Sequence, residues 1–172
     1  SAPLNTKITL MIELFIRFAV DHPNRFKPLK TYLWQYRDAI SGTHITWGNI
    51  TQLAAINEGI AREILTHHEG LSKTRISNLV APSSLDPDQN KGSALARFYH
   101  ATDAMDIDWS NFEPVYSHWR KVRNPLAHGD FISIEEWLRT ESIQTYRMLA
   151  NSFNWLALRY IGFPIDKISF SD

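Results

Sequence analysis

The sequence predicts a single all-α domain over residues 1–172, a bundle of about five to seven helices. Apolar residues recur at helical spacing through most of the chain, and no run alternates in the way that a half-buried strand would. A length of 172 residues suits one hydrophobic core. The helices expected are justified below in chain order.

The first helix is expected over residues 7–21. Its polar residues recur every four positions and form one narrow stripe, namely Thr9, Glu13, Arg17 and Asp21. Apolar side chains cover the rest of the surface, which predicts a nearly buried helix. Pro23 and Pro28 bracket a short connection, and a second helix is expected over 29–40, with Gly42 as its cap.

The longest helix of the first half is expected over residues 47–69, where apolar residues follow the 3.6-residue period for more than five turns. A short helix at 74–80 leads into residues 81–92, whose prolines, serines and aspartates predict an exposed surface loop. We expect this loop to be the most mobile segment.

Three further helices complete the predicted bundle. They are expected over 93–105, over about 112–123 with Ser110 or Asn111 as the cap, and from the capping box at 133–136 to about Tyr160. Ile132 is placed to pack against Trp137 at the start of the last helix.

Composition excludes several classes of function. The chain has no cysteine, which excludes a disulfide scaffold, a thiolate zinc site and a cysteine nucleophile. Its 18 basic and 18 acidic residues balance, so any anion site must be local. No segment reaches the roughly 18 apolar residues that span a bilayer. We therefore expect a cytoplasmic protein with no membrane partner, while the start at Ser1 leaves further domains open.

No pattern in the sequence indicates a metal or a cofactor. The seven glycines are too dispersed for a phosphate-binding loop. His67, His68 and Glu69 are adjacent, and neighbouring helical positions point about 100° apart, so they cannot chelate one ion together. We expect neither a metal site nor a cofactor.

One segment stands out by its charge. Residues 117–128 carry three cations, two histidines and no acid, in an otherwise balanced chain. Arginine offers a planar fork to phosphate oxygens, and histidine can take and give a proton near neutral pH. The segment is therefore the candidate site for holding a phosphodiester and moving a proton.

This segment resembles the motif of the HEPN superfamily, small all-α domains that carry an Arg, then a polar residue, and a His four to six residues on. The matching residues are Arg123, Asn124 and His128, in the run RNPLAHG. The spacing alone is unspecific, because it also occurs from Arg17 to His22 and from Arg62 to His67. Only Arg123 is followed by Asn.

Local geometry bears on the motif. In an unbroken helix, residues five apart lie about 140° apart around the axis, so Arg123 and His128 would face different ways. Pro125 disfavours helix at Asn124, and we expect a break or kink to bring the two side chains onto one surface. The alternative is that Asn-Pro and Gly129 merely end a helix, which Arg123 and His128 decorate.

The resemblance implies a metal-independent endoribonuclease, often of a toxin–antitoxin or antiviral system, in which two motifs meet in one cleft of a homodimer. It assigns the scissile phosphate to Arg123, general base or acid catalysis to His128, and an orienting hydrogen bond to Asn124. Arg120 and Lys121 are candidates for contacts with the RNA backbone.

The remaining candidates are one further site residue and the partners of the chain. His118 is a secondary site candidate, and an antitoxin or a nucleotidyltransferase-type protein is an implied partner. Aromatic residues on several faces make the last helix the expected dimer contact: Trp137, Tyr146, Phe153, Trp155 and Tyr160. Two other interpretations stay open. One is a non-catalytic HEPN-like module that binds a nucleotide or a partner, as the tail of a longer protein. The other is an unrelated helical adaptor.

Overall fold

The computed structural model describes residues 4–128 and 139–168, and over these ranges it is all-helical, without a strand. The all-α prediction is confirmed. The elements in chain order are α1 (Leu4–Asp21), α2 (Pro23–Ile40), α3 (Trp47–Glu63), the π-helical turn η1 (Ile64–His68), α4 (Lys73–Ser77), α5 (Ala94–Ala104), α6 (Trp109–His128), α8 (Ser142–Tyr160) and the 3₁₀ turn η2 (Ile165–Lys167). None of the described helices is long and apolar enough to cross a bilayer.

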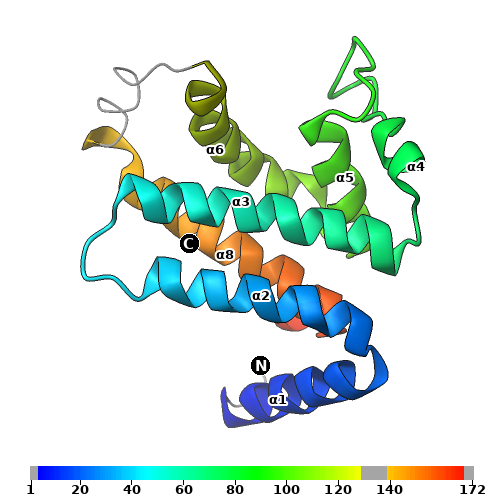
Figure 1. Cartoon of the computed structure of the whole chain (residues 1–172), viewed down its shortest axis with the longest axis vertical. Coiled ribbons are helices and arrows are strands. Elements are labelled where there is room, and N and C mark those ends of the chain that lie inside the picture. Colours follow the sequence, from blue (N-terminus) through cyan, green and yellow to red (C-terminus); the bar gives the residue numbers. More distant parts are fainter. Residues whose placement is uncertain (1–3, 129–138, 169–172) are drawn as a thin grey trace.

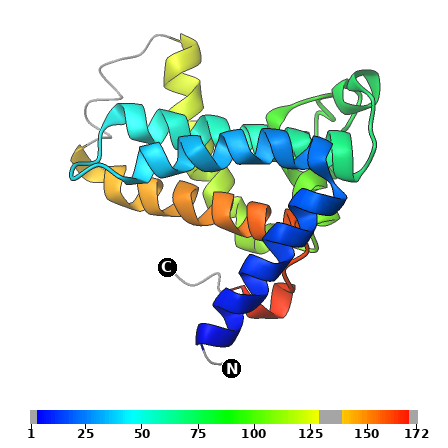
Figure 2. The ribbon, with the colours of Figure 1, turned by 60° about the horizontal axis from the view of Figure 1, so that its bottom comes forward.

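Helix α3 is the centre of the bundle. Figure 1 shows it running across the molecule, with α2 and α8 on one side and α5 and α6 on the other. Its residues Ile50, Leu53 and Ile60 are completely buried, as are Phe112 of α6 and Phe153 of α8. Turned by 60°, the same ribbon shows α1 leaning away from these layers (Figure 2).

One polar side chain lies inside this apolar core. Asn57 of α3 is completely buried, and its amide nitrogen donates to the carbonyl oxygens of Leu53 and Leu149, at 2.8 Å each. The buried Ser152 hydroxyl donates to the Asn57 Oδ1 atom at 2.6 Å. Because buried polar groups are costly when unpaired, these bonds fix the position of α3 against α8.

The N-terminal half differs from the prediction in two ways. Helix α1 is not nearly buried, since among its residues from Thr6 onward only Phe18 is fully covered, and a row of its apolar side chains is exposed. Helix α2 begins at Pro23, directly after His22, so the expected connection between Pro23 and Pro28 is helical. Proline fits the first turn because its missing N–H has no partner there, and α2 also accommodates Pro28.

Helix α6 is longer at both ends than expected. It starts at Trp109, and the Asp108 carboxylate accepts hydrogen bonds from the Ser110 amide at 2.8 Å and hydroxyl at 2.7 Å. Asp108 thus takes the capping role predicted for Ser110 or Asn111. The helix continues past Pro125 to His128, so the predicted break after Arg123 is wrong.

The loop and the last helix also differ from the prediction. In residues 81–92, Ala81 and Asp86 are buried, and the Asp86 carboxylate accepts hydrogen bonds from the Asn90 backbone and side chain. The capping box at 133–136, with Ile132 and Trp137, lies outside the described residues. In α8, the predicted contact surface is wrong for three aromatics that are buried in the chain's own core: Phe153, Trp155 and Tyr160. Tyr146 is half-buried.

The Asn57 network yields a stability prediction. Replacing Ser152→Ala leaves the Asn57 oxygen buried without its donor, which should lower the free energy of unfolding by about 1–3 kcal/mol. Ser77→Ala is the matched control, because the Ser77 hydroxyl is exposed and bonds only to its own helix. Urea unfolding measures both. Equal midpoints for the two variants would contradict a structural role for the network.

Candidate functional site

A buried tryptophan positions the motif helix on the central helix. The Trp119 indole of α6 donates to the carbonyl oxygen of Ala54 in α3 at 3.2 Å, and Val122 beside it is completely buried. One turn further along each helix, Arg123 meets Glu58. The motif arginine is therefore held over α3 by ordinary core packing.

Three arginines surround the Glu58 carboxylate, and we call these four residues the Arg–Glu cluster. The Arg123 Nε atom lies 3.6 Å from Oε2, whereas Nη2 of Arg97 and Nη2 of Arg62 lie 3.1 and 3.8 Å from Oε1. Arg97 is also anchored by its Nη1 atom, which donates to the Gly92 carbonyl at 2.6 Å. Three guanidinium groups on one carboxylate leave a formal charge of +2.

The cluster opens into a pocket of about 460 Å³ between α2, α3 and α6. Tyr32 of α2 forms one wall, and its ring packs directly on Gly59 of α3. A Cβ atom at position 59 would lie 2.6 Å from the ring, so only glycine permits this approach. Burial raises the pKa of the Tyr32 phenol, the Glu63 carboxylate adds to the rise, and Arg62 opposes it. The phenol therefore stays protonated at neutral pH.

Exposure decides what the pocket can do. The side chains of Arg62 and Arg123 are 62% and 50% exposed, whereas Glu58 is 19% exposed. The inner carboxylate thus holds the arginines while their outer donors face solvent. Such an arrangement suits an anion with several oxygens, such as a phosphate, because each guanidinium can donate two parallel hydrogen bonds.

The other residues of the basic segment lie elsewhere on α6. Among the described residues of the segment, only Arg123 lines the pocket. Lys121 pairs with Glu141 at 2.7 Å on the side of α8, whereas Arg120 and Asn124 are exposed. Arg120 and Lys121 remain within reach of an extended polyanion that passes over α6, but they add nothing to the pocket itself.

His118 is packed inside the fold and does not face the pocket. It is buried between α6 and α8, and its Nδ1 atom lies 2.6 Å from the Thr145 hydroxyl. Burial lowers the pKa of the imidazole, and the charge of Lys121 lowers it further, while Glu141 opposes the shift. As a secondary catalytic candidate His118 fails on access, since a substrate cannot reach a side chain enclosed in this way.

The helix register separates the two main motif positions. The backbone of His128 belongs to α6, and its side chain lies outside the described residues. In a continuous helix, positions 123 and 128 lie about 140° apart around the axis, while positions 124 and 128 lie about 40° apart. The structure therefore places Arg123 at the pocket, and the continuous backbone of α6 lacks the break that was expected to bring Arg123 and His128 onto one surface.

Sequence reasoning missed most of the Arg–Glu cluster and of the pocket wall. Glu58, Arg62, Arg97 and Tyr32 were not candidates, although Glu58 and Arg62 have the i,i+4 spacing of a helical ion pair. Arg62 also begins one of the three R-x4-H runs. No local pattern signals Arg97, because it reaches Glu58 from a helix 39 positions away in the sequence.

Comparisons with protein-family models, with curated proteins and with solved structures give no match. In the part of the chain that the structure describes, no group of three or more histidine or acidic side chains is placed to hold a metal ion.

The buried imidazole predicts a pH dependence of stability. Because the pKa of His118 is lower in the folded chain than the unfolded value of about 6.5, the unfolded state binds more protons near that pH. The fold should therefore lose stability as the pH falls below about 6.5. The variant His118→Gln should lose less over the same range, measured by urea unfolding at several pH values. Parallel curves for the two proteins would contradict this assignment.

Proposed function

We propose that the chain binds the phosphate backbone of RNA at the Arg–Glu cluster and cleaves it as a metal-independent endoribonuclease of the HEPN type. The observation that carries the proposal is that Arg123, the arginine of the motif, lines an accessible pocket together with Arg62, and that Arg97 pairs with the same Glu58 carboxylate. A net positive pocket in a chain of zero formal charge is a local anion site.

The pocket offers a phosphate two kinds of donor. The half-exposed guanidinium groups of Arg62 and Arg123 supply charge-assisted hydrogen bonds, which are stronger than neutral ones. The protonated Tyr32 phenol is a neutral donor on the pocket wall. Glu58 keeps the arginines in place before the ligand arrives, so little ordering is needed when it binds.

The proposed reaction is transesterification. The ribose 2′-hydroxyl loses its proton to an imidazole and attacks the adjacent phosphorus, the bond from phosphorus to the 5′-oxygen breaks, and that oxygen takes up a proton. The products are a 2′,3′-cyclic phosphate and a 5′-hydroxyl. Arg123 would stabilise the charge that develops on the phosphate oxygens. No metal or bound water takes part.

The imidazole in this proposal is His128 of a second copy. In a continuous helix, positions 123 and 128 are about 140° apart around the axis, and the HEPN resemblance implies that two motifs share one cleft. Asn124 would orient the imidazole or the phosphate, and Arg120 and Lys121 would guide the RNA backbone across α6. A toxin–antitoxin or antiviral setting, with an antitoxin or nucleotidyltransferase-type partner, belongs to the same proposal.

A second candidate is a non-catalytic module that binds a nucleotide or an RNA end. Glu58 is compatible with it, because the three arginines that this carboxylate engages can retain a phosphate without a histidine acting beside them. The two candidates share the pocket and differ in whether a histidine acts there.

Cleavage of labelled single-stranded RNA in the presence of EDTA tests the proposal. Arg123→Ala should lower the rate at least about 100-fold, because one donor to a developing oxyanion contributes that much. His128→Ala should have a similar effect through loss of the proton acceptor. Arg75→Ala, which removes an exposed arginine of α4, should leave the rate unchanged.

Mixing the two inactive variants tests the origin of the imidazole. In a two-fold dimer, Arg123→Ala and His128→Ala chains together rebuild one intact site per mixed dimer, so about a quarter of the wild-type rate should return. No recovery would place both groups on one chain. If the wild type binds RNA without cutting it, and Arg123→Ala abolishes that binding, the chain is the binding module and not the enzyme.

A further inference from the structure

The outer face of α1 carries a continuous row of exposed apolar side chains. Ile8, Ile12, Ile16 and Val20 recur at every fourth residue, and we call this row the α1 ridge. Single exposed apolar side chains are ordinary, but a contiguous row marks an interaction surface. The ridge runs directly beside the polar row that the sequence predicts to face water.

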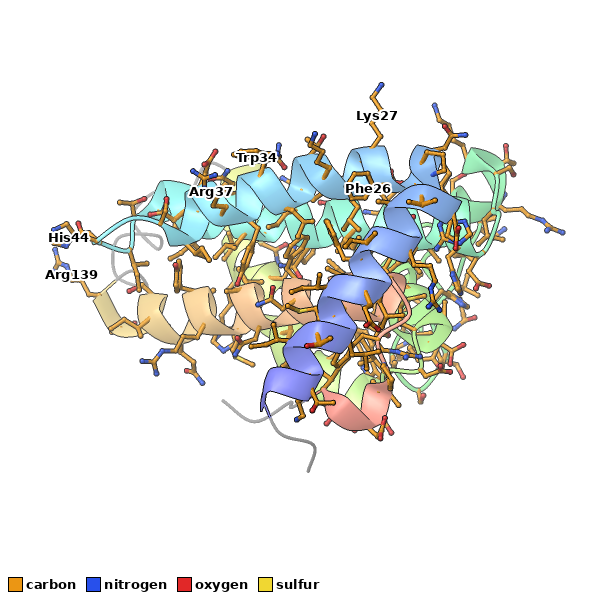
Figure 3. All side chains as sticks on the ribbon, turned by 90° about the horizontal axis from the view of Figure 1, so that it is seen from below. Phe26, Lys27, Trp34, Arg37, His44 and Arg139 are labelled. Carbon is orange, nitrogen blue, oxygen red and sulfur yellow. The ribbon has the colours of Figure 1, made fainter. Side chains whose placement is uncertain are left out.

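Apolar grooves flank the same helix. One, of about 330 Å³, lies towards α8 and is lined by residues that include Met11, Ile12 and Leu158. The other, of about 350 Å³, follows α2 past Phe26 and the exposed Trp34. Figure 3 looks onto this surface and shows α1 crossing in front of α2 and α8. Ridge and grooves thus lie side by side on one face.

We propose that this face binds a second copy of the chain, with the two α1 helices packed antiparallel about a two-fold axis near Leu14. In that register Ile12 lies opposite the partner's Ile16, and Ile8 lies opposite the partner's Val20. Every member of the ridge therefore has another member opposite it in register. Rows with four-residue spacing interlock at about 50°, so the contact is closest at the central pair.

The charges of α1 select this partner and this direction. About the same axis, Glu13 lies within two positions of the partner's Arg17, and both belong to the polar row on the same side of the ridge. A parallel pair would place like charges together instead, which is unfavourable. A helix whose apolar row and charges both complement their own inverted copy is suited to a self-complementary, isologous contact.

This contact is separate from the proposed ribonuclease site. Figure 1 places α1 and α6 at opposite ends of the molecule, so pairing through α1 leaves the Arg–Glu cluster open. RNA cleavage and assembly through α1 can therefore be measured and lost independently.

Light scattering of the full chain tests the proposal. The mass of the wild-type assembly should exceed the 19.9 kDa of one chain. Ile16→Lys should give an assembly of half the wild-type mass, because the dissociation constant of the α1 contact should rise at least about tenfold. Ile143→Lys is the matched control, because Ile143 on the first turn of α8 is 58% exposed and Ile16 is 57% exposed. Circular dichroism verifies that both variants fold. An equal mass for wild type and Ile16→Lys would overturn the proposal.

Charge exchange tests the direction of packing. Glu13→Arg should weaken assembly, because it faces the partner's Arg17 with a like charge. Adding Arg17→Glu on the same chain should restore it, since the opposite pairs then form again. A wild type that stays monomeric but sediments with phospholipid vesicles, or a double variant no better than the single one, would refute pairing through α1.

Discussion

The fold depends on a single helix that is buried along most of its length and must therefore satisfy every polar atom that it carries inward. Asn57 marks this constraint, because its amide bonds to Leu53 and Leu149 and accepts from Ser152 within an otherwise apolar core. Such a network has one good geometry, whereas apolar contacts alone tolerate sliding. With α3 fixed on α8, the next residue along, Glu58, projects about 100° away and faces α5 and α6.

The candidate site follows from that placement. Glu58 is largely covered, and a covered carboxylate needs positive partners, which the chain supplies from three separate segments. Arg97 is itself fixed by the end of the 81–92 loop through the Gly92 carbonyl, so loop, α5 and α3 meet at one point. Arg123 arrives because Trp119 docks one turn earlier. Arg123 thus pairs with Glu58 and also keeps an accessible edge. Both proposed functions, the ribonuclease and the binding module, depend on this combination.

Periodicity predicted which residues form helices. It did not determine how far each helix is covered by its neighbours or where each helix ends. The apolar period of α1 shows which side chains share a face, but how much neighbouring surface exists to cover them depends on the positions of α2 and α8. The same limit applies to Pro125. Its missing N–H removes one helical hydrogen bond, and the continuation of α6 past it depends on tertiary packing, which local helix propensity does not describe. Arg123 could be found from charge and motif, whereas Arg97 could not, because only the tertiary fold brings it to Glu58.

The Arg–Glu pocket and the α1 ridge differ in chemistry, and α1 lies at the opposite end of the bundle from α6, which carries Arg123 (Figure 1). A charged pocket gains little from a second copy of itself, since two such pockets repel, so motif pairing across α6 needs a polyanion between the copies. An apolar ridge has the opposite property, because it is stabilised by contact with its own kind and requires no ligand. It follows that assembly through α1 should be constitutive and insensitive to RNA, whereas any approach of two α6 helices should depend on RNA and weaken with salt.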